Sequence, residues 1–312
     1  MKTAVFPRRF PAVLLALLVG VSWAPAAKAQ DSPSPRVVAS IKPIHSLVAG
    51  VMEGVGTPKL IVRGSGSPHA YTLRPSDARA LSRAELIFWV GAPLETFLVK
   101  PLAALGGAAR IVSLVEAEGV LRLAPRVGGE KHDATEGSFD PHLWLDPGNA
   151  AAMARAIGRA LAGVDPARES AYRRNVQRLE RRLTALEQFL SARLAPLAGR
   201  PYVVFHDGYR YFERRFALPA VAAITPSPEH LLGARRLVEI RALVRRTGAR
   251  CVFGEVQFAS RLGATVVEGT GARLASLDPL GAALEEGPEL YFALMNGLAA
   301  ALVECLSGVA GR

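Results

Sequence analysis

Residues 169–194 read ESAYRRNVQRLERRLTALEQFLSARL, and their apolar side chains recur at spacings of three and four. Arginine and glutamate occupy most of the positions between them. This pattern predicts one amphipathic helix from Glu169 to Leu194, about 39 Å long at 1.5 Å per residue. A helix of this length can run along two lobes and join them. An ordinary core helix of a single domain would show the same pattern.

On both sides of this helix, short β-branched or apolar runs alternate with helical patterns. The predicted strands before it are 37–41, 60–62, 86–90 and 111–112, and the predicted helices are 43–52, 75–81 and 94–105. The predicted strands after it are 202–205, 220–222, 251–253 and 274–277, and the predicted helices are 229–246 and 289–305. Such alternation indicates βαβ units and parallel sheets. We therefore expect an α/β protein of two lobes, 30–165 and 198–312, each with a mostly parallel sheet flanked by helices. The segment 166–197, which contains the long helix, would join them rigidly.

The first 29 residues have the pattern of a secretory signal peptide. A basic start precedes an apolar run over residues 12–21, and the segment ends in Ala-Lys-Ala at Ala29. The apolar run is too short to span a bilayer, and the small-residue ending is a cleavage signal. We expect cleavage after Ala29 and a periplasmic mature chain that begins at Gln30. No later stretch is expected to be long and apolar enough to cross a membrane.

The composition indicates a globular protein and argues against a nucleic-acid partner. Of 312 residues, 50% are apolar and 21% are charged, and the net charge is +11. Four of the basic residues lie in the leader, which contains no acid. The remaining arginines are interspersed with glutamates, which is typical of a solvated face rather than of a clustered basic patch.

Three of the six histidines follow predicted strands or lie between prolines. His69 lies in GSPHAYTLRPSD, His142 in DPHLWLDP and His206 in VVFHDGYRYF. Asp278, in SLDPLG, also follows a predicted strand directly. Ligands in α/β folds bind just beyond the carboxyl ends of the strands. These four side chains could therefore converge in one cleft.

The motifs SPHAYTLRPSDA, DPHLWLDP, FHDGYRYF and LDPLG, in this order, resemble the periplasmic zinc-binding proteins of ABC importers, the ZnuA type of the cluster A-I metal-receptor family. The resemblance covers essentially the whole mature chain. It implies that His69, His142 and His206 bind zinc between two lobes joined by a rigid helix. It also implies a receptor, expected to be a monomer, that delivers zinc to a membrane permease with a cytoplasmic ATPase. No enzymatic activity is expected.

The chain departs from the family pattern in two places. Zinc receptors often have a long His- and Asp-rich loop before DPHLWL, whereas the loop 128–139 is short here and contains only His132. Some members have a glutamate directly before the first histidine as a possible ligand, and this chain has Pro68. Two candidates therefore remain for the fourth coordination position, Asp278 and water.

The donor chemistry favours zinc over its alternatives. Three neutral imidazoles with one oxygen ligand suit tetrahedral Zn²⁺, whereas manganese prefers more carboxylate and water ligands. Manganese-type receptors of the family tend to have a glutamate where His206 stands. A manganese or iron receptor remains one alternative, and a metal-dependent adhesin or storage protein is another. A periplasmic zinc hydrolase, with water in the fourth position and Glu255 nearby, is an alternative of a different class, but the sequence contains no HExxH or GxSxG motif.

Other polar residues near the motifs have more ordinary interpretations as well. Asp140, Asp146 and Asp207 could orient ligand imidazoles, although the first two could equally cap turns beside prolines. His132 and His230 are expected in solvent, and His45 near a strand end is a weaker candidate ligand. Four residues are expected to hold the His69 loop in shape: Tyr71, Thr72, Arg74 and Ser76.

The chain has two cysteines, Cys251 and Cys305, both in predicted regular elements. An exported chain permits a disulfide, and we expect one between these two cysteines; two buried free thiols are the alternative. Neither cysteine has a CxxC or CxxH neighbour, which argues against a thiolate metal site.

Overall fold

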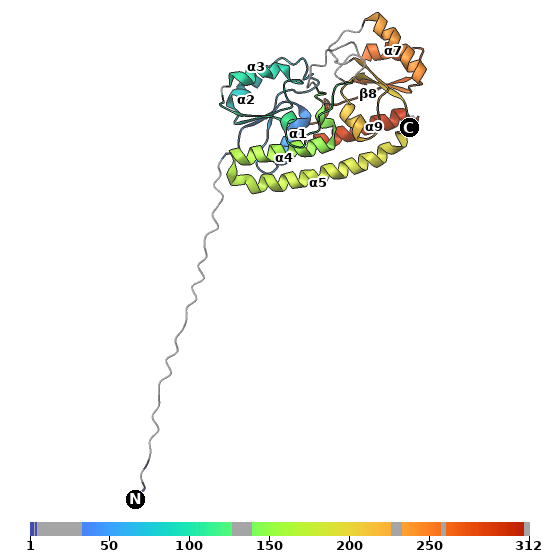
Figure 1. Cartoon of the computed structure of the whole chain (residues 1–312). Helices are drawn as coiled ribbons and strands as arrows, with labels where there is room; N and C mark the ends of the chain where they lie inside the picture. The colour runs from blue at the N-terminus through green and yellow to red at the C-terminus, as the bar shows by residue number, and fades with distance from the viewer. Residues whose placement is uncertain are drawn as a thin grey trace. The chain divides into compact units, whose positions relative to one another are not determined.

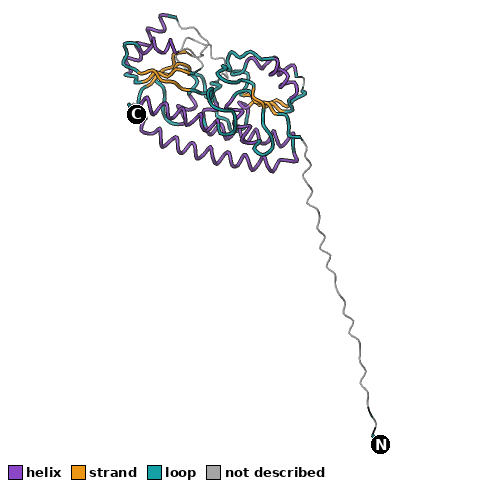
Figure 2. Tube along the Cα trace, turned by 180° about the vertical axis from the view of Figure 1, so that it is seen from behind, coloured by secondary structure: helices purple, strands orange, loops and turns teal. Residues whose placement is uncertain are grey.

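The computed structural model describes residues 33–105, 107–126, 139–225, 233–256 and 260–308, together with residues 1, 2 and 4 of the leader. Residues 34–312 form one compact unit by their contacts. Within it, two parallel sheets lie side by side, and one long helix runs beneath both of them (Figures 1 and 2). The predicted fold class is confirmed.

The first sheet is parallel and has the strand order β2-β1-β3-β4. Its strands are β1 (Val37–Ala39), β2 (Lys59–Leu60), β3 (Leu86–Trp89) and β4 (Arg110–Ser113). The helices that connect them are α1 (Lys42–Val51), α2 (Pro75–Arg83) and α3 (Thr96–Ala104). The central strand β1 is buried along its whole length, as expected for a parallel sheet covered by helices.

The second sheet repeats this arrangement with the order β6-β5-β7-β8. Its strands are β5 (Tyr202–His206), β6 (Ala222–Thr225), β7 (Cys251–Glu255) and β8 (Arg273–Leu277). The helices are α6 (Arg210–Arg215), α7 (Ala234–Thr247), α8 (Ser260–Val267) and α9 (Leu290–Ser307). The prediction placed the second strand at 220–222, but β6 begins at Ala222, which pairs with Val203 of β5.

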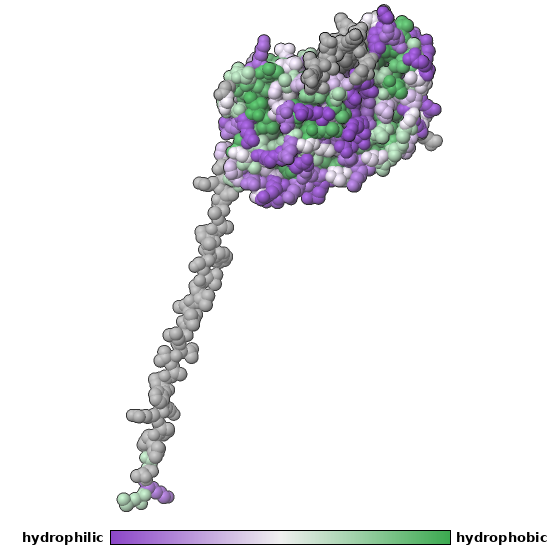
Figure 3. Space-filling model, viewed as in Figure 1, coloured by the Kyte–Doolittle hydropathy of each residue, from purple (hydrophilic) through white to green (hydrophobic). Residues whose placement is uncertain are grey.

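The helix α5 extends from Glu169 to Leu194, the bounds that its sequence pattern predicts. Its buried face packs against α1 and α4 (Pro147–Val164) of the first lobe and against α9. The outer face carries its exposed arginines, and hydrophilic side chains gather along this edge of the molecule (Figure 3). The two lobes therefore share one continuous helical support.

Three helices are absent from the sequence-based prediction: α4, α6 and α8. The signal for α4 is present in the sequence, because Asp146 precedes Pro147 and an alanine-rich stretch. The Asp146 carboxylate accepts hydrogen bonds from the N–H groups of Gly148 and Asn149 and so caps this helix. The other two helices are only 6 and 8 residues long, which leaves little periodicity to detect.

Helix α9 corrects the expectation that no stretch after the leader could span a membrane. By length and composition alone, α9 is long and apolar enough to do so, and it is the one such helix among the described residues. Half of this apolar stretch is buried inside the protein, where it packs against α1, α5 and β8. Its apolarity is therefore that of a core helix.

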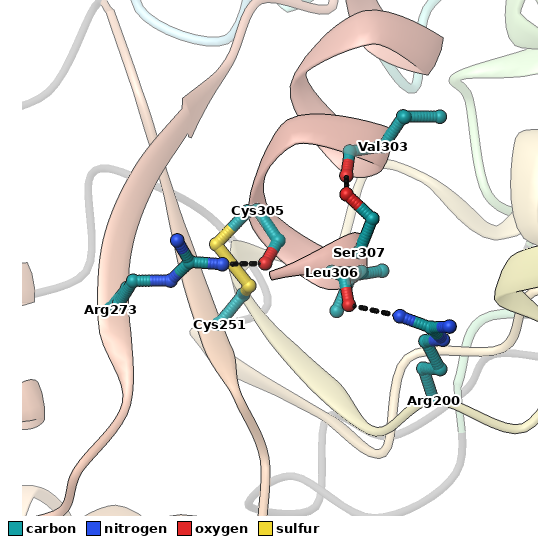
Figure 4. The surroundings of a disulfide bond; sticks show 7 residues. All are labelled: Arg200, Cys251, Arg273, Val303, Cys305, Leu306 and Ser307. Atoms are coloured by element: carbon teal, nitrogen blue, oxygen red, sulfur yellow. Dashed lines mark hydrogen bonds between the residues drawn. A yellow bond between two sulfur atoms is a disulfide. The ribbon is translucent and has the colours of Figure 1, made fainter. Parts of the chain in front are cut away.

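A disulfide joins Cys251 of β7 to Cys305 near the end of α9, as predicted (Figure 4). Two arginines bind the last carbonyl groups of the same helix. Arg200 donates to the carbonyl oxygen of Leu306 at 2.6 Å, and Arg273 donates to that of Cys305. Cations at a helix C-terminus interact favourably with its unpaired carbonyls. The disulfide and the Arg273 hydrogen bond thus attach α9 to the second sheet, and Arg200 attaches it to the segment just before β5.

Candidate metal site

The structure brings His69, His142 and His206 together although the sequence separates them widely. Each offers one ring nitrogen, and these atoms all lie within 4.8 Å of one another. The Nε2 atoms of His69 and His142 are 3.3 Å apart, and the ring centroids of His142 and His206 are 4.7 Å apart. His142 and His206 are buried, and His69 is partly exposed. Among the described residues, this is the one cluster of three or more side chains arranged to hold a metal ion.

Local structure explains how each histidine reaches the cluster. His206 is the last residue of β5, so the central strand of the second sheet delivers it to the carboxyl edge. His142 immediately precedes a 3₁₀ turn (Leu143–Leu145) that leads into α4. His69 lies in the loop between β2 and α2. Strand ends and loops at the carboxyl edge are the usual ligand positions in α/β folds.

Hydrogen bonds of Tyr71 and Arg74 hold the loop that contains His69. The hydroxyl of Tyr71 donates to the carbonyl oxygen of Ile61 and to the Asp77 carboxylate, both at 3.1 Å. The same carboxylate accepts the N–H of Arg74 at 3.0 Å, where α2 begins. These contacts match the shaping role predicted for Tyr71 and Arg74, and Asp77 anchors them both.

Two buried carboxylates orient two of the imidazoles. Asp140 Oδ1 accepts the Nδ1–H of His142 at 2.8 Å and its backbone N–H at 2.9 Å. Glu255 Oε1 accepts the Nδ1–H of His206 at 3.0 Å, and Tyr209 donates to the same oxygen at 2.9 Å. We assign the protons to Nδ1 because carboxylates only accept. The lone pairs of both histidines are then on Nε2, on the side of the cluster.

The residues of the cluster fit a metal ion. His206 Nε2 is buried and has no hydrogen-bond partner among the described residues. A buried polar atom without a partner is energetically unfavourable, and a metal ion would accept its lone pair. Imidazole nitrogens backed by carboxylates are a characteristic zinc-binding arrangement. A metal ion held by the three histidines would therefore give the buried Nε2 of His206 a partner.

The electrostatics of the site separate His69 from His206. Burial, together with the nearby His142 and His206, lowers the pKa of His69 to about 2. Burial also disfavours protonation of His206, but the charge and hydrogen bond of Glu255, together with the charges of Asp140 and Asp207, outweigh it and raise the pKa of His206. In the metal-free protein, His69 is thus neutral, whereas His206 retains a proton more readily than His69 does.

Asp278 is not part of the cluster of three histidines. Its carboxylate closes the turn after β8 by accepting the N–H groups of Leu280, Gly281 and Ala282 at 3.1, 2.8 and 2.6 Å. The buried ammonium group of Lys42 holds the same turn through three backbone carbonyl oxygens. The carboxylate of Asp278 therefore shapes the loop beside the site.

Other candidates from the sequence have separate roles. Asp146 caps α4 and pairs with Arg215 at 2.7 Å, and Asp207 pairs with Arg126 at 2.9 Å. His45 Nε2 donates to the carbonyl oxygen of Pro58 at 3.0 Å, and His45 lies outside the cluster. His132 and His230 lie outside the described residues, as do residues 128–138 of the predicted loop.

Sequence reasoning missed the contribution of Tyr209, and it placed Glu255 near the site without predicting its contact with His206. Glu255 ends β7, next to β5 in the sheet, so parallel pairing brings it beside His206. A glutamate at the end of an apolar strand was the available signal. The contact itself spans 49 residues of sequence.

Replacing Glu255 with glutamine or Asp140 with asparagine should weaken metal binding by about tenfold to a hundredfold. Each change removes the charge that makes the bonded imidazole a better donor and fixes its ring. Titration calorimetry with zinc measures the effect. Glu239→Gln is the matched control, since Glu239 is exposed on α7 and pairs only with Arg235 and Arg236 among the described residues. Native affinity in both site variants would contradict the orienting role.

Comparisons with known proteins identify the relatives of this chain. A family model described as zinc-uptake complex component A, periplasmic, matches residues 37–305. The chain is 44% identical to the high-affinity zinc uptake system protein ZnuA of Brucella suis, over 87% of this chain and 91% of that protein. It is 32% identical to the protein of the same name from Paracoccus denitrificans, over 94% and 97% of the two chains. A solved structure titled "Crystal structure of ZnuA" has a TM-score of 0.77 and 25% identity, over 88% of this chain and 99% of that one.

Proposed function

This chain belongs to the ZnuA family of periplasmic zinc-uptake components, and we propose that it captures Zn²⁺ with His69, His142 and His206 and delivers it to an ABC permease. The observation that carries the proposal is the buried Nε2 of His206, which has no hydrogen-bond partner among the described residues and is grouped with one ring nitrogen from each of the other two histidines. An ion at this position would use all three lone pairs. The bound zinc is the cargo of the protein and not a resident cofactor.

The donor set supports zinc over manganese or iron. Three imidazole nitrogens form most of a tetrahedral zinc shell, whereas manganese prefers carboxylate and water oxygens. Asp140 and Glu255, two carboxylates beside the cluster, accept hydrogen bonds from the far sides of the rings. They therefore support the imidazoles and leave a nitrogen-rich site.

The fourth ligand in this proposal is a water molecule or Asp278. Water is supported by the position of Asp278, whose two oxygens accept three backbone N–H groups and lie outside the cluster. A carboxylate oxygen has a further lone pair, so Asp278 can still complete the shell. X-ray absorption of the zinc-loaded wild type and of the Asp278→Ala variant separates the two, because the scattering from a carboxylate carbon near zinc is expected, and is lost in the variant, only if Asp278 is a ligand.

The remaining parts of the proposal concern the partners of the receptor, its oligomeric state, the cleavage of its leader and the bounds of its lobes. Relatives of this chain carry the names of zinc-uptake system proteins, which supports a membrane permease and its ATPase as partners. We further propose a monomer, cleavage of the leader after Ala29, and lobes of 30–165 and 198–312 joined by residues 166–197. An enzyme is not supported, because the family is one of uptake components and Glu255 is engaged by His206 and Tyr209.

Metal analysis and uptake together test this function. The mature protein should bind one zinc ion per chain and retain it in the presence of excess manganese. Cells that lack the receptor should recover growth under zinc limitation when this chain is supplied. Preferential retention of manganese would refute the zinc assignment, and zinc binding without recovery of growth would refute delivery to the permease.

Zinc affinity should fall as the pH decreases from about 7 to 5, with fewer than three protons displaced per zinc ion. Zinc requires neutral imidazoles. His69, with its pKa lowered to about 2, carries no proton to displace in this range. The pKa of His206 is raised, so His206 behaves differently from His69. As the pH falls through this pKa, a proton competes with zinc for the His206 imidazole. Competition with a chelator of known pH dependence measures the slope. A zinc affinity that does not change with pH would exclude the three histidines as ligands. Displacement of three protons per zinc ion would contradict the lowered pKa of His69.

A further inference from the structure

The segment 121–126, which has no regular secondary structure, contacts α4 of the first lobe and α6 of the second. At its beginning, Leu121 exchanges two hydrogen bonds with the side chain of Asn149 on α4, at 2.7 and 3.0 Å. At Leu123, the backbone N–H donates to the hydroxyl of Tyr211 at 3.0 Å. Tyr211 lies on α6 and donates in turn to the carbonyl oxygen of Asp140 at 2.8 Å. The segment thus spans from α4 to α6 beside the residue that orients His142.

Arg126, at the end of this segment, uses all three guanidinium nitrogens on the second lobe. Nε donates to Asp207 Oδ1 at 2.9 Å, and Nη2 donates to Glu213 at 2.8 Å. Nη1 donates to the carbonyl oxygen of Ala220 at 3.1 Å. The planar fork of arginine makes such simultaneous contacts, which a lysine ammonium cannot reproduce. The contacts to Asp207 and Glu213 span 81 and 87 residues of sequence.

The burial of this cluster distinguishes it from a surface ion pair. The side chains of Arg126, Asp207 and Glu213 are 25%, 14% and 6% exposed. Removal of one partner from a buried pair is costly because it leaves an uncompensated charge. Without the guanidinium, Glu213 would retain a buried carboxylate in need of solvation. The arrangement in which Arg126 reaches Glu213 is therefore strongly favoured over one in which the segment has moved away.

The cluster is connected to two of the proposed zinc ligands. Asp207 directly follows His206 in the chain. Glu213 shares α6 with Tyr211, which binds the backbone of Asp140, and Asp140 accepts the Nδ1–H of His142. Movement of Arg126 away from the second lobe would release contacts on both sides of the site.

We propose that Arg126 is a positioning residue that latches the segment 121–126 onto the second lobe and holds His142 and His206 at zinc-binding spacing. The proposal rests on the zinc-receptor function proposed above. The latch slows the release of zinc. When Arg126 loses its contacts with the second lobe, His142 and His206 separate and the ion dissociates. A zinc-loaded protein without the latch therefore releases its ion faster.

Arg126→Gln tests the latch, and Arg122→Gln is the matched control on the same segment. Arg122 forms an exposed pair with Glu116 at 3.6 Å, with side chains 52% and 66% exposed. Zinc dissociation is measured by stopped flow, with a chromophoric chelator in excess capturing the released ion. We expect Arg126→Gln to raise the dissociation rate by at least about tenfold, and Arg122→Gln to leave it within about twofold of the wild type. The rate from the loaded protein does not depend on the fraction of unfolded chains.

Urea unfolding of the zinc-free variants separates positioning from simple structural support. A lower free energy of unfolding with an unchanged zinc dissociation rate would overturn the proposal. Should Arg126→Gln fail to fold, Asp207→Asn replaces it, since that variant keeps the buried pair of Arg126 and Glu213. An increase in the dissociation rate of about threefold or more is then expected, and an unchanged rate overturns the proposal. Failure of the wild-type protein to bind zinc would instead refute the proposed function.

Discussion

Replacing His206 with alanine should weaken zinc binding by at least about a hundredfold, because the loss of a direct ligand costs more than the loss of an outer-shell partner. His206 is buried, and its two ring nitrogens differ in their hydrogen bonding. Its Nδ1 is bound to Glu255, and its Nε2 has no partner among the described residues. Alanine would remove the donor atom and leave Glu255 as a buried carboxylate with only Tyr209 bonded to the same oxygen. Calorimetry, or chelator competition where the affinity is too high, measures the change.

The same loss is expected for His69→Ala and His142→Ala, because all three ring nitrogens lie within 4.8 Å of one another. His132→Ala and His230→Ala are the matched controls. Both change a histidine outside the proposed ligand set, and neither should alter the affinity by more than about twofold. Near-native zinc affinity in the His206→Ala protein would refute the three-histidine site. A large loss in His132→Ala would instead add that residue to the ligands.

Removal of the disulfide should lower the free energy of unfolding by about 4 kcal/mol, the chain-entropy cost of a loop of this length. Cys251 and Cys305 are 54 residues apart in sequence, and the bond joins β7 to the end of α9. The double variant Cys251→Ala/Cys305→Ala avoids a single reactive thiol in the interior. Urea denaturation of this variant and of the wild type gives the difference. Zinc affinity should be unchanged, since neither cysteine is a proposed ligand.

Thiol titration provides an independent check on the same bond. The denatured wild-type protein should show no reactive thiol until reductant is added. Two titratable thiols in protein purified from the periplasm would contradict the disulfide. A substantial loss of zinc affinity in the folded double variant would show that attachment of α9 also determines the geometry of the site.

The amino-acid sequence by itself determined the features that depend on local periodicity and on short motifs. The spacing of Tyr172, Leu179, Leu186 and Leu194 predicts the full length of α5, because a helix repeats every 3.6 residues whatever surrounds it. The alternation of short apolar runs with helical patterns predicts both parallel sheets. The positions of His69, His142 and His206, after strands or between prolines, make them candidates for one cleft, and the family resemblance of their motifs implies that they bind zinc.

Only the tertiary structure decided which polar groups meet around the three histidines. The contact of Glu255 with His206 depends on the pairing of β5 with β7, and the contact of Arg126 with Asp207 depends on the path of a segment without regular structure. Asp278 follows a predicted strand just as His206 does, yet its carboxylate accepts hydrogen bonds from its own turn. Local sequence cannot distinguish these outcomes. A carboxylate, wherever it stands in the chain, binds the donors that long-range packing places within hydrogen-bond distance.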